Sequence, residues 1–160
     1  MGLWPDPVES VASVLRADRV EARIEELPQG TASARDAAAA VGCELDQIVK
    51  SLVVVADGAF VLVMIPGDRR ADEGRIATVV GAEAVRMAKA DEVVHATGFE
   101  PGGVAPFPLR AVTEVLMDRA LFGHKKVWTG AGTHTHVLGL PPEDLHRLSK
   151  ARSVDLAPGR

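Results

Sequence analysis

The sequence is poor in cysteine and in aromatic residues. It has one cysteine, Cys43, two tryptophans, four phenylalanines and no tyrosine. A single cysteine excludes an intramolecular disulfide and a zinc site built from cysteines. Its apolar neighbours favour a packed thiol over a nucleophile. So few aromatic rings also argue against a platform on which single-stranded nucleic acid would stack.

Long apolar runs and an excess of positive charge are also absent. No segment is long enough to cross a bilayer, and residues 1–6 lack the basic and apolar regions of a signal peptide. We therefore expect a cytoplasmic protein that does not enter a membrane. The net charge of −4 argues against a broad basic surface for nucleic acid. A few Lys and Arg residues could still recognise a nucleic-acid end.

The length of 160 residues and the 47% hydrophobic content suit a single domain, 1–160, with one core. We expect that core to span about residues 21–151 and to be followed by a loose polar tail, 152–160. Neither an internal repeat nor a low-complexity tract interrupts the chain.

Hydrophobic periodicity and turn residues predict short helices alternating with short strands. The helical segments expected are 7–18, 34–41, 45–49, 72–80, 90–97, 119–122 and 141–151. The strands expected are 22–27, 51–56, 59–65, 84–87, 111–117, 126–129 and 136–140. Ser33 is the expected N-cap and Gly42 the expected stop of the second helix, and Asp57-Gly58 is a hairpin signal. This pattern indicates a mixed α/β domain with a substantially antiparallel sheet.

Residues 98–107 form the most unusual stretch, because they contain three glycines and two prolines. Glycine permits positive φ and close approach of another group, whereas proline fixes φ and removes a donor. The segment is either an ordinary connection or a shaped turn whose backbone N–H groups face a ligand.

Lys50 interrupts an apolar run, since Ile48 and Val49 precede it and residues 52–55 are Leu-Val-Val-Val. Such a lysine either extends its ammonium to solvent or presents it to a cleft. In a cleft, it would supply a point charge for a phosphate or a developing oxyanion.

Four segments in this order resemble the YbaK/prolyl-tRNA synthetase-associated domain family: 48–53, 98–107, 115–118 and 130–133. The resemblance covers about residues 21–151. It implies an α+β fold in which short helices surround a mostly antiparallel, barrel-like sheet. It also implies an aminoacyl-tRNA deacylase, which hydrolyses the ester of a wrongly attached amino acid without a cofactor.

The resemblance also implies roles for particular residues. Lys50 matches the family lysine that contacts the phosphate at the tRNA 3′ end, and Gly98 to Pro101 match the loop that holds the aminoacyl group. Lys50, Gly98 and Pro101 are therefore the expected catalytic residues. The expected substrate-binding residues are Ser51, Phe99, Glu100, Gly102, Gly103, Gly130, Ala131, Gly132, Thr133, His134 and His136. The position of Ser51 varies in the family and bears on amino-acid choice.

The remaining polar residues leave the general base unidentified. His134 and His136 are two apart, so on a strand both would point to one face, and either could line the pocket. No third metal ligand with suitable spacing is evident, and we expect no metal. For Asp118, at the end of a strand, a structural cap is favoured over a base. We therefore expect catalysis by positioning, with water activated by the substrate's own ribose hydroxyl or amino group.

Two functions remain open. The first is a trans-acting deacylase for mischarged tRNA, most simply tRNA for proline carrying alanine, cysteine or serine. The alternative is a non-catalytic module that binds aminoacyl-tRNA or a synthetase. Either way, the expected partners are the 3′ acceptor end of a tRNA with its amino acid and an aminoacyl-tRNA synthetase.

Overall fold

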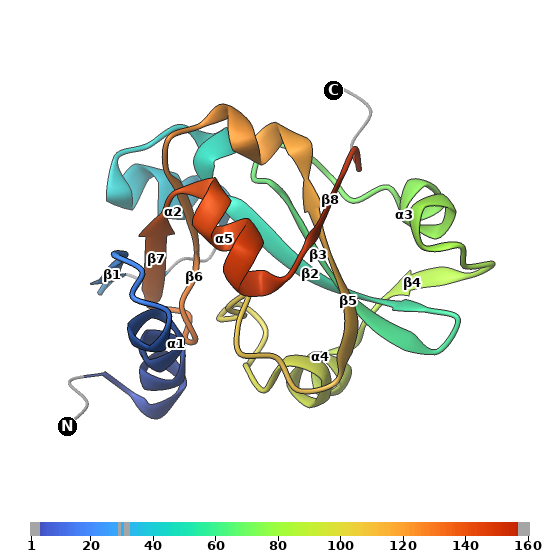
Figure 1. Ribbon diagram of the computed structural model, residues 1–160, viewed down its shortest axis with the longest axis horizontal. Coiled ribbons are helices and arrows are strands. Elements are labelled where there is room, and N and C mark those ends of the chain that lie inside the picture. The colour runs from blue at the N-terminus through green and yellow to red at the C-terminus, as the bar shows by residue number, and fades with distance from the viewer. Residues whose placement is uncertain (1–3, 29, 31–32, 157–160) are drawn as a thin grey trace.

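Two β-sheets organise the chain in the computed structural model, which describes residues 4–28, 30 and 33–156 (Figure 1). The smaller sheet has the strand order β1 (Arg23–Glu26), β7 (His136–Leu140), β6 (Val127–Gly130). The larger sheet has the order β4 (Val85–Met87), β2 (Val49–Ala56), β3 (Ala59–Pro66), β5 (Val112–Asp118), β8 (Arg152–Val154). β3 pairs with β5, and β5 with β8, in parallel, whereas the other pairs of neighbours are antiparallel. The predicted mixed α/β, mostly antiparallel architecture is confirmed.

The predicted barrel-like closure is wrong. The sheets remain separate, and a single parallel bridge between Ile48 and Trp128 is the pairing that connects them within the described part of the chain. β6 pairs with β7 on one edge, and its other edge joins the β2 side only through the Ile48–Trp128 bridge, so the barrel stays open.

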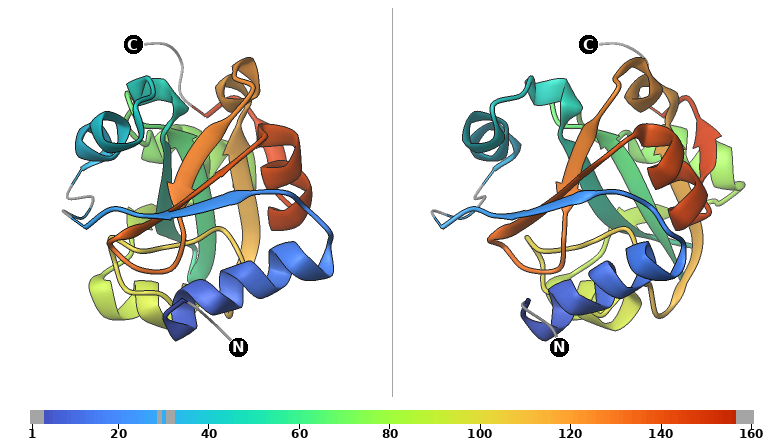
Figure 2. Two further views of the ribbon diagram at one scale, coloured as in Figure 1. Left: turned by 90° about the vertical axis from the view of Figure 1, so that its left-hand side faces the viewer. Right: turned by 60° about the vertical axis from the view of Figure 1, so that its left-hand side comes forward.

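Short helices cover the sheets, in agreement with the helical periodicity of the sequence. They are α1 (Asp6–Ala17), α2 (Ala34–Val41), α3 (Glu73–Val80), α4 (Ala90–Thr97) and α5 (Pro142–Ser149), with 3₁₀ turns η1 (Leu45–Gln47) and η2 (Arg119–Gly123). Figure 2 shows α2 and α5 on opposite sides of the smaller sheet. None of these described helices is both long and apolar enough to span a membrane.

The local signals that the sequence carries are found where they were predicted. Ser33 accepts a hydrogen bond from the Asp36 N–H at the start of α2, and Gly42, at φ 77°, ends that helix. The β2–β3 hairpin turns at Asp57 and Gly58, both with positive φ. The Asp57 carboxylate accepts hydrogen bonds from the N–H groups of Glu83 and Ala84, which lower its pKa.

The centre of the larger sheet is buried on both faces, which explains the long apolar runs of β2 and β3. Alternate residues of β3 enter different clusters: Leu62 and Met64 pack toward the smaller sheet, and Val63 and Ile65 pack with Ile76 of α3. The same alternation places Val53 of β2 in the first cluster.

The predicted loose tail is wrong for its first part. Residues 152–154 form β8, which pairs with Leu116–Asp118 of β5, and the Leu156 side chain is buried. A three-residue polar edge strand lacks the hydrophobic alternation by which strands are recognised, so the sequence pattern missed it. The core also reaches beyond residue 21, because Val8 and Val11 of α1 are fully buried. Residues 157–160 lie outside the described residues.

Residues 98–107 and the glycine turn 130–133 pack backbone against backbone. A Cβ atom on Gly103 would lie 2.7 Å from Thr133 Cα, and one on Gly130 would lie 2.5 Å from the Val104 carbonyl oxygen. Both distances are shorter than side chains tolerate. Glycine is therefore required at these two positions by close approach.

We expect Gly103→Ala to lower the free energy of unfolding by about 1–3 kcal/mol, because the new methyl group forces the two segments apart. Urea or thermal unfolding measures the effect. Gly123→Ala is the matched control, since a Cβ there has open space and φ is not positive, and we expect a change near zero. Equal stability of the Gly103 variant and the wild type would contradict the contact.

Candidate functional site

A pocket of about 340 Å³ lies beside the Ile48–Trp128 bridge, between the two sheets. Residues 49–52 of β2 form one side, residues 129–130 of β6 form the other, and α2 provides a third wall. The lining residues are Ser33, Ala34, Ala37, Val41, Ile48, Val49, Lys50, Ser51, Leu52, Gly102, Val104, Trp128, Thr129, Gly130 and Val137. β4 pairs with β2 only from Val54 onward, so residues 49–52 form a sheet edge facing this pocket.

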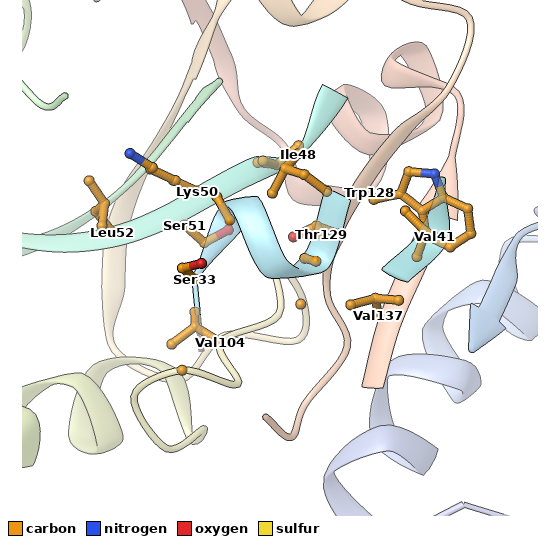
Figure 3. Close-up of a pocket in the computed structure, with 15 residues that line it drawn as sticks. Ser33, Val41, Ile48, Lys50, Ser51, Leu52, Val104, Trp128, Thr129 and Val137 are labelled. Carbon is orange, nitrogen blue, oxygen red and sulfur yellow. The ribbon is translucent and has the colours of Figure 1, made fainter. Parts of the chain in front are cut away.

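Lys50 is the charged residue among those that line the pocket, and Figure 3 shows its nitrogen pointing away from Ser51 and Thr129. Its side chain is half-buried, and its Nζ donates a hydrogen bond to the Arg69 carbonyl oxygen at 2.8 Å. The Arg69 guanidinium lies 4.0 Å from the buried Asp118 carboxylate. An ammonium has three N–H donors, and the bond to Arg69 uses one. The lysine is thus held in position by the loop after β3 while it borders the pocket.

Two buried hydroxyl groups also face the pocket. Ser51 Oγ and Thr129 Oγ1 are shielded from solvent, and neither has a hydrogen-bond partner among the residues described. Thr129 is only 1% exposed. In Figure 3 their oxygens turn toward the same space, with Ser33 beside Ser51.

The opposite end of the pocket is apolar. Trp128 and Val41 lie together there, with Val137 below them (Figure 3). Lys126 Nζ stands 4.6 Å from the centroid of the Trp128 ring, a cation–π contact that helps to hold the indole in place. The pocket therefore joins a polar end to a hydrophobic wall, as small-molecule sites commonly do.

The structure brings four of the expected site residues to this pocket: Lys50, Ser51, Gly102 and Gly130. Thr129, Trp128, Val137 and Ser33 were not predicted as site residues. Thr129 had one usable signal, its position directly before the expected glycine turn. Trp128 and Val137 had none, because hydrophobic residues on strands are ordinary core residues.

The other expected loop residues lie beside the pocket. Gly98 ends α4 with φ 84°, and the Phe99 side chain is buried in the main core. Glu100 and Pro101 are exposed. The Thr97 hydroxyl donates to the Val93 carbonyl oxygen at 2.7 Å and accepts from the Phe99 N–H at 3.0 Å, which fixes the start of the loop.

The turn that follows Gly130 is closely packed as well. Ala131 is buried, and its N–H donates to the His136 carbonyl oxygen. Gly132, at φ 115°, packs against the backbone of Pro7 in α1. Gly103, described above, contacts Thr133 in the same turn. These residues do not line the pocket, but they pack against the segments that do.

His134 and His136 have different surroundings. β7 begins at His136, so His134 lies in the preceding turn, where it is exposed. His136 is 4% exposed, and its Nδ1 lies 2.6 Å from Thr133 Oγ1 and 3.1 Å from Thr135 Oγ1. Neither histidine lines the pocket. Within the described residues, no three His, Cys, Asp or Glu side chains gather as a metal site.

The contacts of Asp118 and Cys43 agree with structural rather than catalytic roles. Asp118 Oδ1 accepts a hydrogen bond from the Ala120 N–H at 2.8 Å, so the predicted cap is confirmed. Burial, and next the nearby charges of Glu44 and Asp46, raise the pKa of the Cys43 thiol. A raised pKa lowers the thiolate fraction at neutral pH, which agrees with a packed rather than nucleophilic cysteine.

Comparison with known proteins reveals relatives of two kinds. The chain is 40% identical over 85 residues to a proline–tRNA ligase of Lactobacillus gasseri, covering 53% of this chain but only 15% of the ligase. It is 32% identical over 127 residues to the uncharacterized protein YwhH of Bacillus subtilis, covering 79% of this chain and 80% of that protein.

A solved structure agrees over nearly the whole chain. It belongs to a protein proposed to be a trans-editing enzyme for prolyl tRNA synthetase, with a TM-score of 0.88 and 33% identity over 98% of this chain and 99% of the other. The family model of the aminoacyl-tRNA editing domain matches residues 28–148. The resemblance in the four sequence segments is confirmed: this chain belongs to the aminoacyl-tRNA editing domain family.

Proposed function

We propose that this chain is a trans-acting deacylase that hydrolyses the ester of mischarged tRNA. The observation that carries the proposal is the pocket that Lys50 helps to line, in a chain whose family is the aminoacyl-tRNA editing domain. A free-standing role is supported by the match over most of YwhH and over nearly all of the trans-editing structural neighbour.

The proposed reaction is a hydrolysis. A water oxygen attacks the ester carbonyl carbon, the bond from that carbon to the terminal ribose oxygen breaks, and the ribose oxygen takes up the proton. The products are the free amino acid and a tRNA with an intact terminal hydroxyl. Lys50 would bind the terminal phosphate and place the ester in the pocket.

Backbone donors would stabilise the developing oxyanion, and the substrate's own hydroxyl or amino group would activate the water. The residues suited to donate are those of the β2 edge and of Gly102 and Gly130. Gly98 and Pro101, which lie beside the pocket, would act indirectly by shaping the loop that presents Gly102. In this scheme no protein side chain serves as general base.

The proposed substrate is tRNA for proline that carries alanine, cysteine or serine. The similarity to proline–tRNA ligases supports this choice of tRNA, and a synthetase is a proposed partner. The alternative function is a module that binds aminoacyl-tRNA without turnover. A panel of aminoacyl-tRNAs separates the two: hydrolysis supports the deacylase, and saturable binding without hydrolysis supports the module.

We expect Lys50→Ala to reduce kcat/KM for deacylation by roughly 10²-fold or more, because the ester loses its charged anchor. Deacylation of labelled aminoacyl-tRNA measures the loss, and the melting temperature should stay close to that of the wild type. Lys89→Ala, which removes an exposed lysine outside the pocket, is the matched control and should retain full activity. Full activity of the Lys50 variant would refute the proposed role.

Salt dependence tests how the acidic chain holds tRNA. With a net charge of −4, we expect about two or three phosphate contacts rather than a broad basic surface. Raising the salt concentration about fourfold should then weaken tRNA binding by roughly 5- to 20-fold. Filter binding at several salt concentrations gives the slope. A loss of several thousandfold would contradict recognition of the acceptor end alone.

A further inference from the structure

The two pocket hydroxyls are chemically unusual within this fold. Buried polar side chains in proteins are usually hydrogen-bonded, and other buried hydroxyls of this chain follow that rule: Thr97 bonds to Val93, and Ser149 bonds to His146. Ser51 Oγ and Thr129 Oγ1 are buried without a partner among the described residues, and both face the same pocket. Because both hydroxyls lie at one pocket, we expect their hydrogen-bond partner to be a ligand that binds there.

The strands that carry these residues explain why the hydroxyls lack a partner. Ser51 lies on the β2 edge beyond the pairing with β4, and Thr129 lies on β6 just past the Ile48–Trp128 bridge. Each backbone is held by its own sheet, at the Ser51–Met64 and Thr129–Leu138 pairs. The sheets separate at this point, so the side chains face the space between them.

The chemistry of the pair limits the ligand group. A hydroxyl is both donor and acceptor, so one hydroxyl on the ligand could donate to one residue and accept from the other. A methyl group in the same place would leave both protein hydroxyls unpaired, and the site would discriminate against it. A thiol forms only weak hydrogen bonds and would be intermediate.

We propose that Ser51 and Thr129 select an amino acid whose side chain carries a hydroxyl, so that serine is preferred over alanine. The inference rests on the proposed function, because it takes the pocket to hold the aminoacyl group. Val104, at the same end of the pocket, supplies an apolar contact for the remainder of a small side chain.

Binding of non-hydrolysable analogues tests the selection without requiring turnover. The probes are seryl and alanyl groups joined by an amide to the 3′ position of 3′-amino-3′-deoxyadenosine, and calorimetry gives the two dissociation constants. We expect the wild-type protein to bind the seryl analogue roughly tenfold or more tightly. Thr129→Val and Ser51→Ala should each reduce that preference severalfold, through weaker binding of the seryl analogue alone.

The control variants separate loss of a hydroxyl from loss of structure. Thr129→Ser retains the hydroxyl and should retain the preference. Thr113→Val makes the same change on β5, outside the pocket, and should leave both affinities unchanged. Melting temperatures of all variants verify folding. A preference that survives Thr129→Val and Ser51→Ala together would overturn the assignment of these residues.

The outcomes also distinguish this inference from the proposed function. Equal affinities for the two analogues would mean that the hydroxyls bind a group that both share, such as the α-amino group or the ribose, and would overturn the inference. Absence of binding by both would overturn it as well. A seryl preference without hydrolysis of any aminoacyl-tRNA would support the selection while refuting the deacylase.

Discussion

The bridge between Ile48 and Trp128 is the constraint on which the site depends. It joins the two sheets at one point. Away from it, β2 pairs with β3 and β6 pairs with β7. If β2 and β6 paired along their lengths, their backbones would close the space in which the pocket lies. β6 pairs with β7, and β2 with β3, on the edges that face away from this opening, so each strand stays part of a sheet although the space between them is open.

Close backbone packing supports that opening from the other side. The contacts of Gly103 with Thr133 and of Gly130 with Val104 bring together two segments that are nearly thirty residues apart in sequence. A larger residue in place of Gly103 or Gly130 would push the two segments apart. Gly102 and Val104 would then move away from the pocket. The rigidity of this wall comes from contacts between main-chain atoms, which tolerate less adjustment than contacts between side chains.

The fold was predictable where the signal is local. The hairpin at Asp57-Gly58 and the caps of α2 depend on residues a few positions apart, and each was recognised from the sequence. β8 and the open arrangement of the sheets depend on which strands meet in space, and neither has a local pattern. For the candidate site, the family resemblance named Lys50, Ser51, Gly102 and Gly130, and these four residues line the pocket. Thr129 was not expected in the pocket, because its place in the lining depends on how the two sheets meet, which has no local sequence pattern.

The burial of α1 and of Leu156 has a consequence for the use of this unit in other chains. A fragment cut at the limits of the family match, 28–148, would lose α1, β1 and β8. The cut would expose the β5 edge and the apolar side chains that Val8, Val11 and Leu156 cover. Excision or grafting of the unit therefore needs junctions outside α1 and Leu156, because the limits 28–148 leave out side chains that are buried in its core.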